Sequence, residues 1–351
     1  MAHPVRLFKY STSGPEDTTP LRRLREEEEF AAEDVMAVVG KTEGNGCVND
    51  FSRTLSSAVW HPLIPPTSVA VFSGGTEGVL NPHVTFLVKE KGGARTGLVA
   101  MVGSTKSFEP EEIGSEKQVR EVEKTVKGMM EKASLSPSAV HLVLVKCPLL
   151  TSSKISSIRA KGLTPVTSDT YDSMAKSRYA TAVGIAVALG EIGGTDQEIE
   201  DGLESDGEKW SAKASCSSGA ELEECHILLL ASDEAKAETE PGRKRLKALQ
   251  GYMKDAVDAD SLIALLTQVR SEKGRIVQVF VKAEASPSGL IRGKRHTMST
   301  DSDVHSTRHA RAAVGGLVAG LTGDTAVYVS GGAEGQGPPG GGSLTIVYEV
   351  D

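Results

Sequence analysis

The stretch Ser73-Gly74-Gly75-Thr76-Glu77-Gly78 indicates how the chain is organised, because two similar stretches follow it. They are Ser217-Ser218-Gly219-Ala220-Glu221-Leu222 and Ser330-Gly331-Gly332-Ala333-Glu334-Gly335. Each is followed within several residues by an apolar run typical of a strand, at 83–88, 226–231 and 344–350. A single hexapeptide of this kind would mean little. Three of them, at comparable places in successive thirds of the chain, indicate an internal repeat.

A second shared feature lies upstream of each serine motif. Apolar runs that end in a lysine occupy residues 35–41, 141–146 and 276–282, and their lysines are Lys41, Lys146 and Lys282. Before each run, apolar residues recur at steps of three and four, over 21–33, 116–133 and 258–269. That spacing predicts amphipathic helices that pack on a sheet. The repeated unit therefore begins with a helix and a strand that ends in lysine.

An arginine stands between the lysine and the serine of each unit, near the start of a second helix or irregular segment. The candidates are Arg53, Arg178 and either Arg308 or Arg311. Matching the repeats to each other favours Arg308 as the third. The predicted unit is thus a helix, a strand with lysine, a segment with arginine, a strand with the serine motif, and a last strand. Its threefold occurrence predicts an α/β fold of three tandem, structurally similar domains.

Polar, glycine-containing stretches at 89–94 and 232–242 separate the units. We therefore expect three repeat domains, at residues 1–92, 97–232 and 242–351. The acidic run at 198–208 is interpreted as a solvated surface loop within the second domain.

Composition excludes several classes of protein. The 351 residues carry 39 Lys and Arg against 47 Asp and Glu, a formal net charge of −8, which argues against nucleic acid or an anionic membrane as partner. No apolar run approaches the roughly 18 residues of a membrane span, and the first residues lack the apolar stretch of a secretory signal. The four cysteines show no Cys-x-x-Cys spacing. We therefore expect a cytoplasmic protein with reduced thiols.

Repeated lysine, arginine and serine point to acyl transfer. A serine hydroxyl becomes a good nucleophile when a base takes its proton, and a lysine serves when burial and a nearby cation lower its pKa. Glycines after the serine let backbone N–H groups approach a developing oxyanion. The second motif has Ser218 where the others have Gly74 and Gly331. Each Lys–Ser pair with its motif is called a corner. Because one chemical event requires one of the three corners to differ from the others, Ser217 with Lys146 is the candidate reactive pair.

Three other interpretations compete with this one. A phosphate-binding loop at Gly40-Lys41-Thr42 fails, because it needs a glycine where Val35 stands. A zinc hydrolase could use His305, His309, Asp301 and Asp303, yet no glutamate lies between the histidines, and the stretch also reads as a helix start capped by Asp or Ser. The third is a triplicated module that binds a small molecule without catalysis.

The chain resembles the cyanuric acid hydrolase and barbiturase family of ring-opening amidohydrolases over essentially its whole length. The motifs that carry the resemblance are residues 40–53 and 73–78, Val145-Lys146-Cys147-Pro148-Leu149-Leu150-Thr151, Ser168-Asp169-Thr170-Tyr171, residues 292–298 and the glycine-rich ending. One departure is a short segment between Arg53 and Ser73. The resemblance implies three like domains around a pseudo-threefold axis, with strands in a central barrel-like core, helices outside and the active site where the domains meet.

The resemblance also implies a reaction. Ser217 would attack a ring carbonyl of cyanuric acid after Lys146 accepts its proton, giving carboxybiuret, which loses carbon dioxide to yield biuret. Barbituric acid, opened to ureidomalonate, is the alternative substrate. Lys41 and Lys282 would support the other two edges of the ring. The implied substrate-binding residues are Arg53, Ser73, Gly74, Arg178, Ser217, Ser218, Arg311, Ser330 and Gly331, with Arg311 preferred to Arg308 from the family's spacing.

A structural cation and an assembly follow from the same resemblance. Magnesium or calcium would be held mostly by backbone oxygens, and all-oxygen ligation suits such hard cations. The implied ligands are Glu284, Ala333, Gln336, Gly337, Pro338 and Gly341. No organic cofactor is expected, and the family suggests a homotetramer.

Overall fold

Each third of the chain builds the same four-stranded sheet, in the computed structural model that describes residues 1–93, 95–204, 208–233 and 244–351. The first third comprises β1 (His3–Ser11), α1 (Thr19–Glu28), β2 (Val35–Thr42), α2 (Phe51–Trp60), β3 (Val69–Gly74) and β4 (His83–Lys89). Its strand order is β3-β2-β4-β1, with β2 and β3 parallel and the other pairs antiparallel.

The second and third parts of the chain repeat this order. The second has β5 (Leu98–Ser104), α3 (Glu116–Ala133), β6 (Val140–Cys147), α4 (Ser152–Ala160), α5 (Thr170–Ala188), α6 (Asp196–Glu204), β7 (Ala214–Ser218) and β8 (His226–Ser232). The third has β9 (Arg245–Met253), α7 (Ala259–Ser271), β10 (Arg275–Ala283), the short β11 (Leu290–Ile291) and β12 (Lys294–Arg295), α8 (Ser306–Thr322), β13 (Tyr328–Gly331) and β14 (Gly342–Val350). Their orders are β7-β6-β8-β5 and β13-β10-β14-β9.

The expected barrel is wrong, because the described strands form open sheets. Two residue pairs between β1 and β5 join the first two sheets into one of eight strands, whereas the third sheet stays separate with four. Near the start of β9, the Leu246 N–H donates a single hydrogen bond to the Thr96 carbonyl, and the described strands β9 and β5 form no ladder. β3, β7 and β13 remain sheet edges, paired on one side only.

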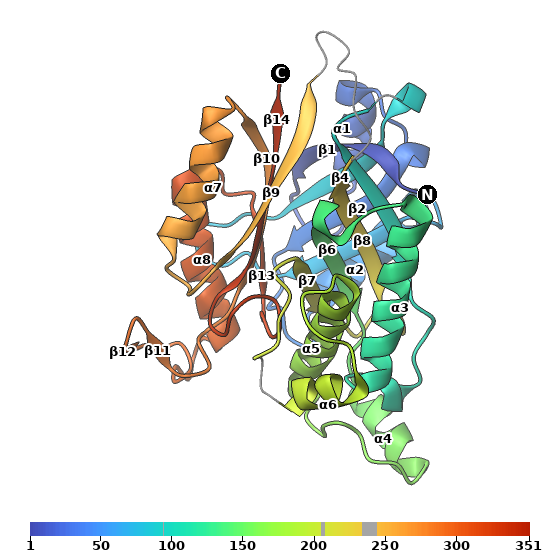
Figure 1. Ribbon diagram of the computed structural model, residues 1–351, viewed down its shortest axis with the longest axis vertical. Coiled ribbons are helices and arrows are strands. Elements are labelled where there is room, and N and C mark those ends of the chain that lie inside the picture. Colours follow the sequence, from blue (N-terminus) through green and yellow to red (C-terminus); the bar gives the residue numbers. More distant parts are fainter. Residues whose placement is uncertain (94, 205–207, 234–243) are drawn as a thin grey trace.

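Apolar packing nevertheless brings the three sheets together. One buried cluster contains Leu7 and Val39 from the first third, Leu144 and Leu228 from the second, and residues of the third such as Phe280. Separate clusters lie between each sheet and its own helices. In Figure 1, α7 and α8 cover one side of the molecule and α3 and α5 the other, with the strands between them. The inner faces of the three sheets therefore share one core.

Two local expectations are corrected. The repeat has a first strand that the sequence pattern did not reveal, since β1, β5 and β9 precede the predicted helices. In β1 and β9 polar and apolar residues are mixed, as in Arg6 and Lys9 beside buried Leu7. The acidic run at 198–208 is a loop only in part, because α6 occupies its start and buries Ile199, while residues 205–207 lie outside the described residues.

The arginine-bearing segment of the first third is a helix despite its short connection to β3. α2 begins after Asp50, whose side chain accepts a hydrogen bond from the backbone N–H of Ser52.

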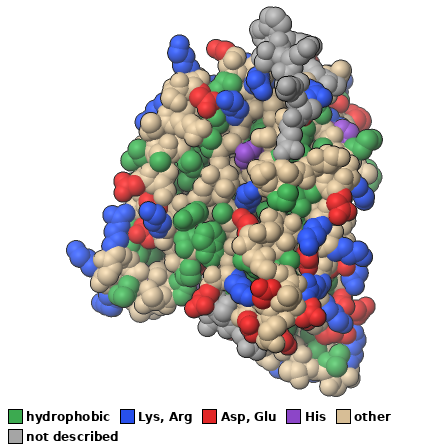
Figure 2. Space-filling model, in the orientation of Figure 1, with side chains coloured by type: hydrophobic (Ala, Val, Ile, Leu, Met, Phe, Trp, Pro, Cys, Tyr) green, Lys and Arg blue, Asp and Glu red, His purple; other side chains and the backbone are tan. Residues whose placement is uncertain are grey.

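On the surface, acidic and basic side chains are interspersed in the view of Figure 2, and α3 carries ion pairs such as Arg120–Glu123 and Lys127–Glu123. None of the helices in the described ranges combines the length and apolarity needed to cross a membrane.

Candidate active site

Strand register places a lysine beside a serine in all three units. The parallel pairs β2–β3, β6–β7 and β10–β13 align Lys41 with Ser73, Lys146 with Ser217, and Lys282 with Ser330. All six side chains are buried. Because adjacent residues of parallel strands point to the same face of a sheet, each register match presents an amine and a hydroxyl together. The repeat seen in the sequence is therefore a repeat of side-chain geometry.

Two of these pairs are hydrogen-bonded and one is not. Lys41 Nζ lies 3.1 Å from Ser73 Oγ, and Lys282 Nζ lies 3.0 Å from Ser330 Oγ. The hydroxyls of Ser73 and Ser330, from different units, are 3.3 Å apart. Ser217 Oγ is buried, yet it forms no hydrogen bond of good geometry within the described part of the chain. Its hydroxyl, which neighbours the Tyr328 hydroxyl, is thus the one of the three that is not hydrogen-bonded to its lysine in the described structure.

The lysines reach into neighbouring units. Lys146 Nζ donates to the carbonyl of Phe72, 2.8 Å away, and Lys282 Nζ donates to the carbonyl of Cys216 at 2.7 Å. Lys41 Nζ lies 5.9 Å from the centre of the Tyr328 ring. Each lysine therefore contacts the serine strand of the preceding unit in cyclic order, which brings the ends of β3, β7 and β13 to one place.

Burial makes the three lysines unusually ready to give up a proton. It lowers the pKa of Lys282 to about 7, helped by the Arg178 guanidinium. It lowers the pKa of Lys41 well below its ordinary value, with Arg311 acting in the same direction. The pKa of Lys146 falls only to about 8, because the Glu221 carboxylate opposes the effect of burial. Amines with these pKa values can serve as bases near neutral pH.

Each arginine comes from a helix between the lysine strand and the serine strand of its unit, and it contacts the next unit. Arg178 on α5 binds Glu334 through Nε and Nη2, at 2.8 and 2.7 Å. Arg311 on α8 binds Glu77 through the same two nitrogens. Arg53 on α2 donates to the backbone carbonyl of Ser218 at 2.9 Å. Arg311 is thus placed like Arg178, and it is buried, whereas Arg308 is only partly buried.

The two glycine corners are places of close approach. A Cβ at Gly74 would lie 1.8 Å from the Asp50 carboxylate, and one at Gly331 would lie 2.4 Å from the Thr307 side chain. Both neighbours belong to the start of an arginine-bearing helix. At the second corner Ser218 fits, and its hydroxyl accepts from Arg178 and donates to the Met174 carbonyl. The side chain that breaks the sequence pattern therefore fixes an arginine.

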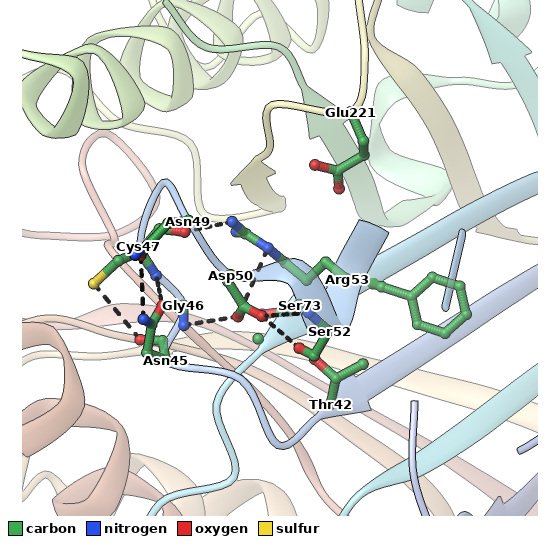
Figure 3. Close-up of polar contacts among 12 residues, drawn as sticks. Thr42, Asn45, Gly46, Cys47, Asn49, Asp50, Ser52, Arg53, Ser73 and Glu221 are labelled. Atoms are coloured by element: carbon green, nitrogen blue, oxygen red, sulfur yellow. Dashed lines mark hydrogen bonds and ion pairs between the residues drawn. The ribbon is translucent and has the colours of Figure 1, made fainter. Parts of the chain in front are cut away.

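Sequence reasoning missed several residues of this site. Glu77, Glu221 and Glu334 recur in all three motifs, so the repeat itself carried the signal, but no role was assigned to them. Asp50 caps α2, accepts from the Gly46 N–H at 2.8 Å, and lies 3.8 Å from Arg53 (Figure 3). Tyr328 gave no signal, because its unit equivalents are Val71 and Ser215. Its buried hydroxyl neighbours Ser217 and Ser73, whose hydroxyls oppose the burial that raises its pKa.

The residues of the expected cation site lie together in the third unit. The Glu284 carboxylate accepts from the Gly340 N–H at 2.9 Å and forms no ion pair among the described residues. Burial and the nearby Glu334 raise the pKa of Glu284 to about 7. The Ala333 and Pro338 carbonyls accept from the N–H groups of Gln336 and Gly341, both at 2.8 Å. A buried carboxyl without a cation, beside a carbonyl-lined turn, fits a hard divalent ion.

The histidines considered for zinc do not converge. The His305 ring caps the start of α8 by accepting from the Thr307 N–H, so the predicted Asp or Ser cap is wrong. His309 instead lies 3.1 Å from Asp301. Within the described ranges no group of three or more His, Cys, Asp or Glu side chains is arranged to hold a metal ion.

Comparison with known proteins identifies the family of this site. Residues 6–349 match the family described as amidohydrolase ring-opening protein. The chain belongs to the ring-opening amidohydrolase family. Curated relatives named cyanuric acid amidohydrolase are 58% identical over 347 residues in Sarocladium sp, covering 99% of both chains, and 52% identical over 347 residues in Rhodococcus sp, covering 98% of this chain and 95% of the relative.

Solved structures of this ring-opening amidohydrolase family share the fold. One is described as a cyanuric acid hydrolase that arose by structural concatenation. It is 41% identical, with a TM-score of 0.90 over 99% of both chains. The cyanuric acid hydrolase of A. caulinodans is 39% identical, with the same TM-score over 100% of both chains. The mixed α/β architecture described above is therefore that of the family.

Proposed function

We propose that this chain opens the ring of cyanuric acid by hydrolysis, giving carboxybiuret, which loses carbon dioxide to form biuret. Membership of the ring-opening amidohydrolase family and the names of its relatives support an amide hydrolase with this substrate. The observation that carries the proposal is the meeting of three buried Lys–Ser pairs, one from each unit. Cyanuric acid has threefold symmetry, with alternating carbonyl and N–H groups, and three equivalent corners match it.

The threefold arrangement of the chain is part of this proposal. Three domains, at 1–92, 97–232 and 242–351, would surround a pseudo-threefold axis that passes between the three serines. The shared strand order and the cyclic contacts of the lysines and arginines support it. The substrate ring would lie across the axis, with Ser73 and Gly74, Ser217 and Ser218, and Ser330 and Gly331 at its three edges, and Arg53, Arg178 and Arg311 around it.

In the proposed reaction, Ser217 Oγ forms a bond to one ring carbonyl carbon while its proton passes to Lys146 Nζ. Backbone N–H groups at the corner stabilise the oxyanion. The ring C–N bond then breaks, and its nitrogen takes the proton from the Lys146 ammonium. Water attacks the acyl-enzyme, which releases carboxybiuret and restores the serine. Lys41 with Ser73, and Lys282 with Ser330, bind and polarise the other two carbonyl edges.

The first test gives the purified chain cyanuric acid and barbituric acid separately. Loss of ultraviolet absorbance and release of biuret or ureidomalonate are followed together. Turnover of cyanuric acid supports the proposal, and mass spectrometry of a quenched reaction should find the added acyl mass on the peptide that contains Ser217. Turnover of barbituric acid alone would overturn the substrate and keep the mechanism. Binding of either ring without turnover would favour a non-catalytic module.

We further propose that Mg²⁺ or Ca²⁺ binds at Glu284 with backbone oxygens of Ala333, Gly337, Pro338 and Gly341. The Gln336 side-chain oxygen accepts from the Cys216 N–H, so this residue would offer its backbone carbonyl. A bound cation would neutralise the buried carboxylate and fix the turn after β13, which carries Glu334 and hence Arg178. A ligand at 100 times its Kd stabilises the folded state by about 2.7 kcal/mol.

Thermal unfolding tests this site. Millimolar MgCl₂ or CaCl₂ should raise the Tm of the unmodified protein, at constant ionic strength, and should not raise that of Glu284→Gln. Glu272→Gln, which changes a carboxylate paired with Lys247 near the surface, is the matched control and should respond like the unmodified protein. Equal responses of all three proteins would contradict the site.

The homotetramer is also a proposal. Phe51 is 76% exposed, and Leu55 and Leu63 on the same stretch of the chain are exposed as well, so the chain offers apolar surface for association. Sedimentation velocity at several concentrations should give a species four times the mass of the chain. A monomer throughout would contradict this assembly.

A further inference from the structure

Three glutamates occupy equivalent positions, four residues after the serines, yet they do not have equivalent partners. Glu77 and Glu334 each form a two-nitrogen ion pair with an arginine of a neighbouring unit, Arg311 and Arg178. Such pairs combine charge with fixed geometry. By the cyclic order of the units, the equivalent partner of Glu221 would be Arg53. The structure shows a different arrangement.

Glu221 pairs with the lysine of its own unit. Its Oε1 lies 3.2 Å from Lys146 Nζ, and both side chains are almost fully buried. Arg53 instead donates to the Ser218 and Cys47 carbonyls, at 2.9 and 2.6 Å, and its Nε has no hydrogen-bond partner among the described residues. Figure 3 shows the Glu221 carboxylate apart from the Arg53 guanidinium, with no contact drawn between them.

This exchange of partners occurs at the corner whose serine is unengaged. Among the described residues, Lys41 and Lys282 are hydrogen-bonded to their serines, and neither forms a hydrogen bond to a carboxylate. Of the three lysines, only Lys146 has an acidic neighbour at ion-pair distance within the described part of the chain. The charged and titratable groups that face the pair are Arg53 from α2, His61 just after α2, and Cys147 from β6. Glu221 favours the ammonium form of Lys146 by ion pairing, whereas the Arg53 guanidinium opposes it.

We propose that Glu221 is a positioning residue that completes a Ser217–Lys146–Glu221 arrangement: its carboxylate orients the Lys146 amine and stabilises the ammonium that forms when Ser217 gives up its proton. The proton passes from Ser217 Oγ to Lys146 Nζ and then to the ring nitrogen, and Glu221 itself stays ionised. A carboxylate plays the same part behind the histidine of serine hydrolases. The proposal rests on the proposed function, and it explains why one of three similar corners reacts.

The test compares Glu221→Gln with Glu334→Gln and Glu77→Gln, which make the same change at the other two corners. Glu221→Gln should lower kcat about 100-fold or more with little change in KM. In this variant the fall of kcat on the acidic side of its pH profile should move to lower pH. Lys146 must be neutral to accept the proton, and without the Glu221 charge its ammonium form is less favoured. Glu221→Asp should recover part of the rate. The two control variants should raise KM, since an arginine loses its partner, and leave the acidic side of the profile in place.

A second readout requires no turnover. In protein labelled with ¹³C at lysine Cε, the Lys146 resonance, assigned by its loss in Lys146→Met, should titrate at lower pH in Glu221→Gln than in the unmodified protein. An unmoved Lys146 titration, or a kinetic profile equal to that of Glu334→Gln, would overturn the proposal. Failure of the unmodified protein to open cyanuric acid would instead overturn the proposed function, and the titration would still decide the role of Glu221.

Discussion

The corner at Ser217 and the corner at Ser330 share a backbone but differ in the way their charges are paired. In both, a lysine on one parallel strand faces a serine on the next. At Ser330 the lysine is hydrogen-bonded to the serine and the glutamate holds an arginine. At Ser217 the serine hydroxyl forms no hydrogen bond of good geometry among the described residues, and the glutamate forms an ion pair with the lysine. A repeated scaffold can therefore differentiate its sites through side-chain partners alone, without any change of strand register.

The largest effect expected from this difference is that of Ser217→Ala. It should reduce kcat for cyanuric acid by at least roughly 10³-fold, because it removes the proposed nucleophile. Its stability should hardly change, since the hydroxyl makes no hydrogen bond of good geometry in the described structure. Ser330→Ala and Ser73→Ala remove hydroxyls that bind a lysine, and should cost about 10-fold, mainly through KM. Steady-state kinetics and thermal unfolding of the three variants provide the measurement.

The opposite ranking of the variants would contradict the assignment of Ser217 as the nucleophile. If Ser330→Ala lost turnover while Ser217→Ala kept it, the hydrogen-bonded pair would be the reactive one. The Ser217 corner would then serve only to bind the ring.

A second, intermediate effect concerns stability against pH. Burial lowers the pKa of Lys282 to about 7 in the folded state, below the value of about 10.4 for an unfolded chain. Between these values the unfolded state binds more protons than the folded state, so the free energy of unfolding rises with pH across this window. The penalty for burying the charge is complete below about pH 7 and absent above about pH 10. A single group of this kind contributes a slope of up to about 1.4 kcal/mol per pH unit.

Lys282→Met removes that contribution. Denaturant unfolding at several pH values from 7.5 to 9.5 should show a shallower rise for this variant than for the unmodified protein. Lys247→Met changes a lysine whose side chain is 42% exposed, and it should leave the slope unchanged. Parallel slopes for all three proteins would show that the buried lysine keeps an ordinary proton affinity.

The sequence predicted most strands and the repeated side chains of this molecule, but not how the charges of its active site are paired. Repetition placed three lysines, three serines and the strands that carry them, because strand register and apolar runs are local properties of the chain. The first strands β1 and β9 escaped because their mixed polar and apolar residues give no clear period, whereas β5 starts with a continuous apolar run and was missed without that cause. The open sheets could not be foreseen either, because the resemblance implied closure and only tertiary packing decides which edges pair.

The partner of Glu221 was also beyond the sequence. Glu77, Glu221 and Glu334 are identical in type and spacing, and Lys146 and Arg53 are both cations within the same site. Which of the two a buried carboxylate contacts depends on how α2 and β7 approach each other, and no periodicity encodes that distance. Tyr328 could not be found from the repeat either, because the equivalent residues of the other two units are of different types and the sequence does not show that it lies between units.

The smallest effect concerns the residues that cap the helices α2 and α5. Asp50 caps α2 and also contacts the Gly46 N–H and, more distantly, Arg53, whereas Asp169 caps α5 by accepting from Tyr171 and Asp172. Replacing either aspartate by alanine should cost about 1 kcal/mol of stability, as the loss of an N-cap generally does. Only Asp50→Ala should also raise KM, by about 10-fold, a change of about 1.4 kcal/mol in binding.

The reason is distance along the helix. Arg53 lies in the first turn of α2, so fraying there moves it directly, whereas Arg178 lies more than two turns into α5 and is held by Glu334. Thermal unfolding and steady-state kinetics of the two variants distinguish these contributions. A KM that rises equally in both would mean that the arginines depend on the whole helix and that the Ser217 corner is no more sensitive than the others to its local support.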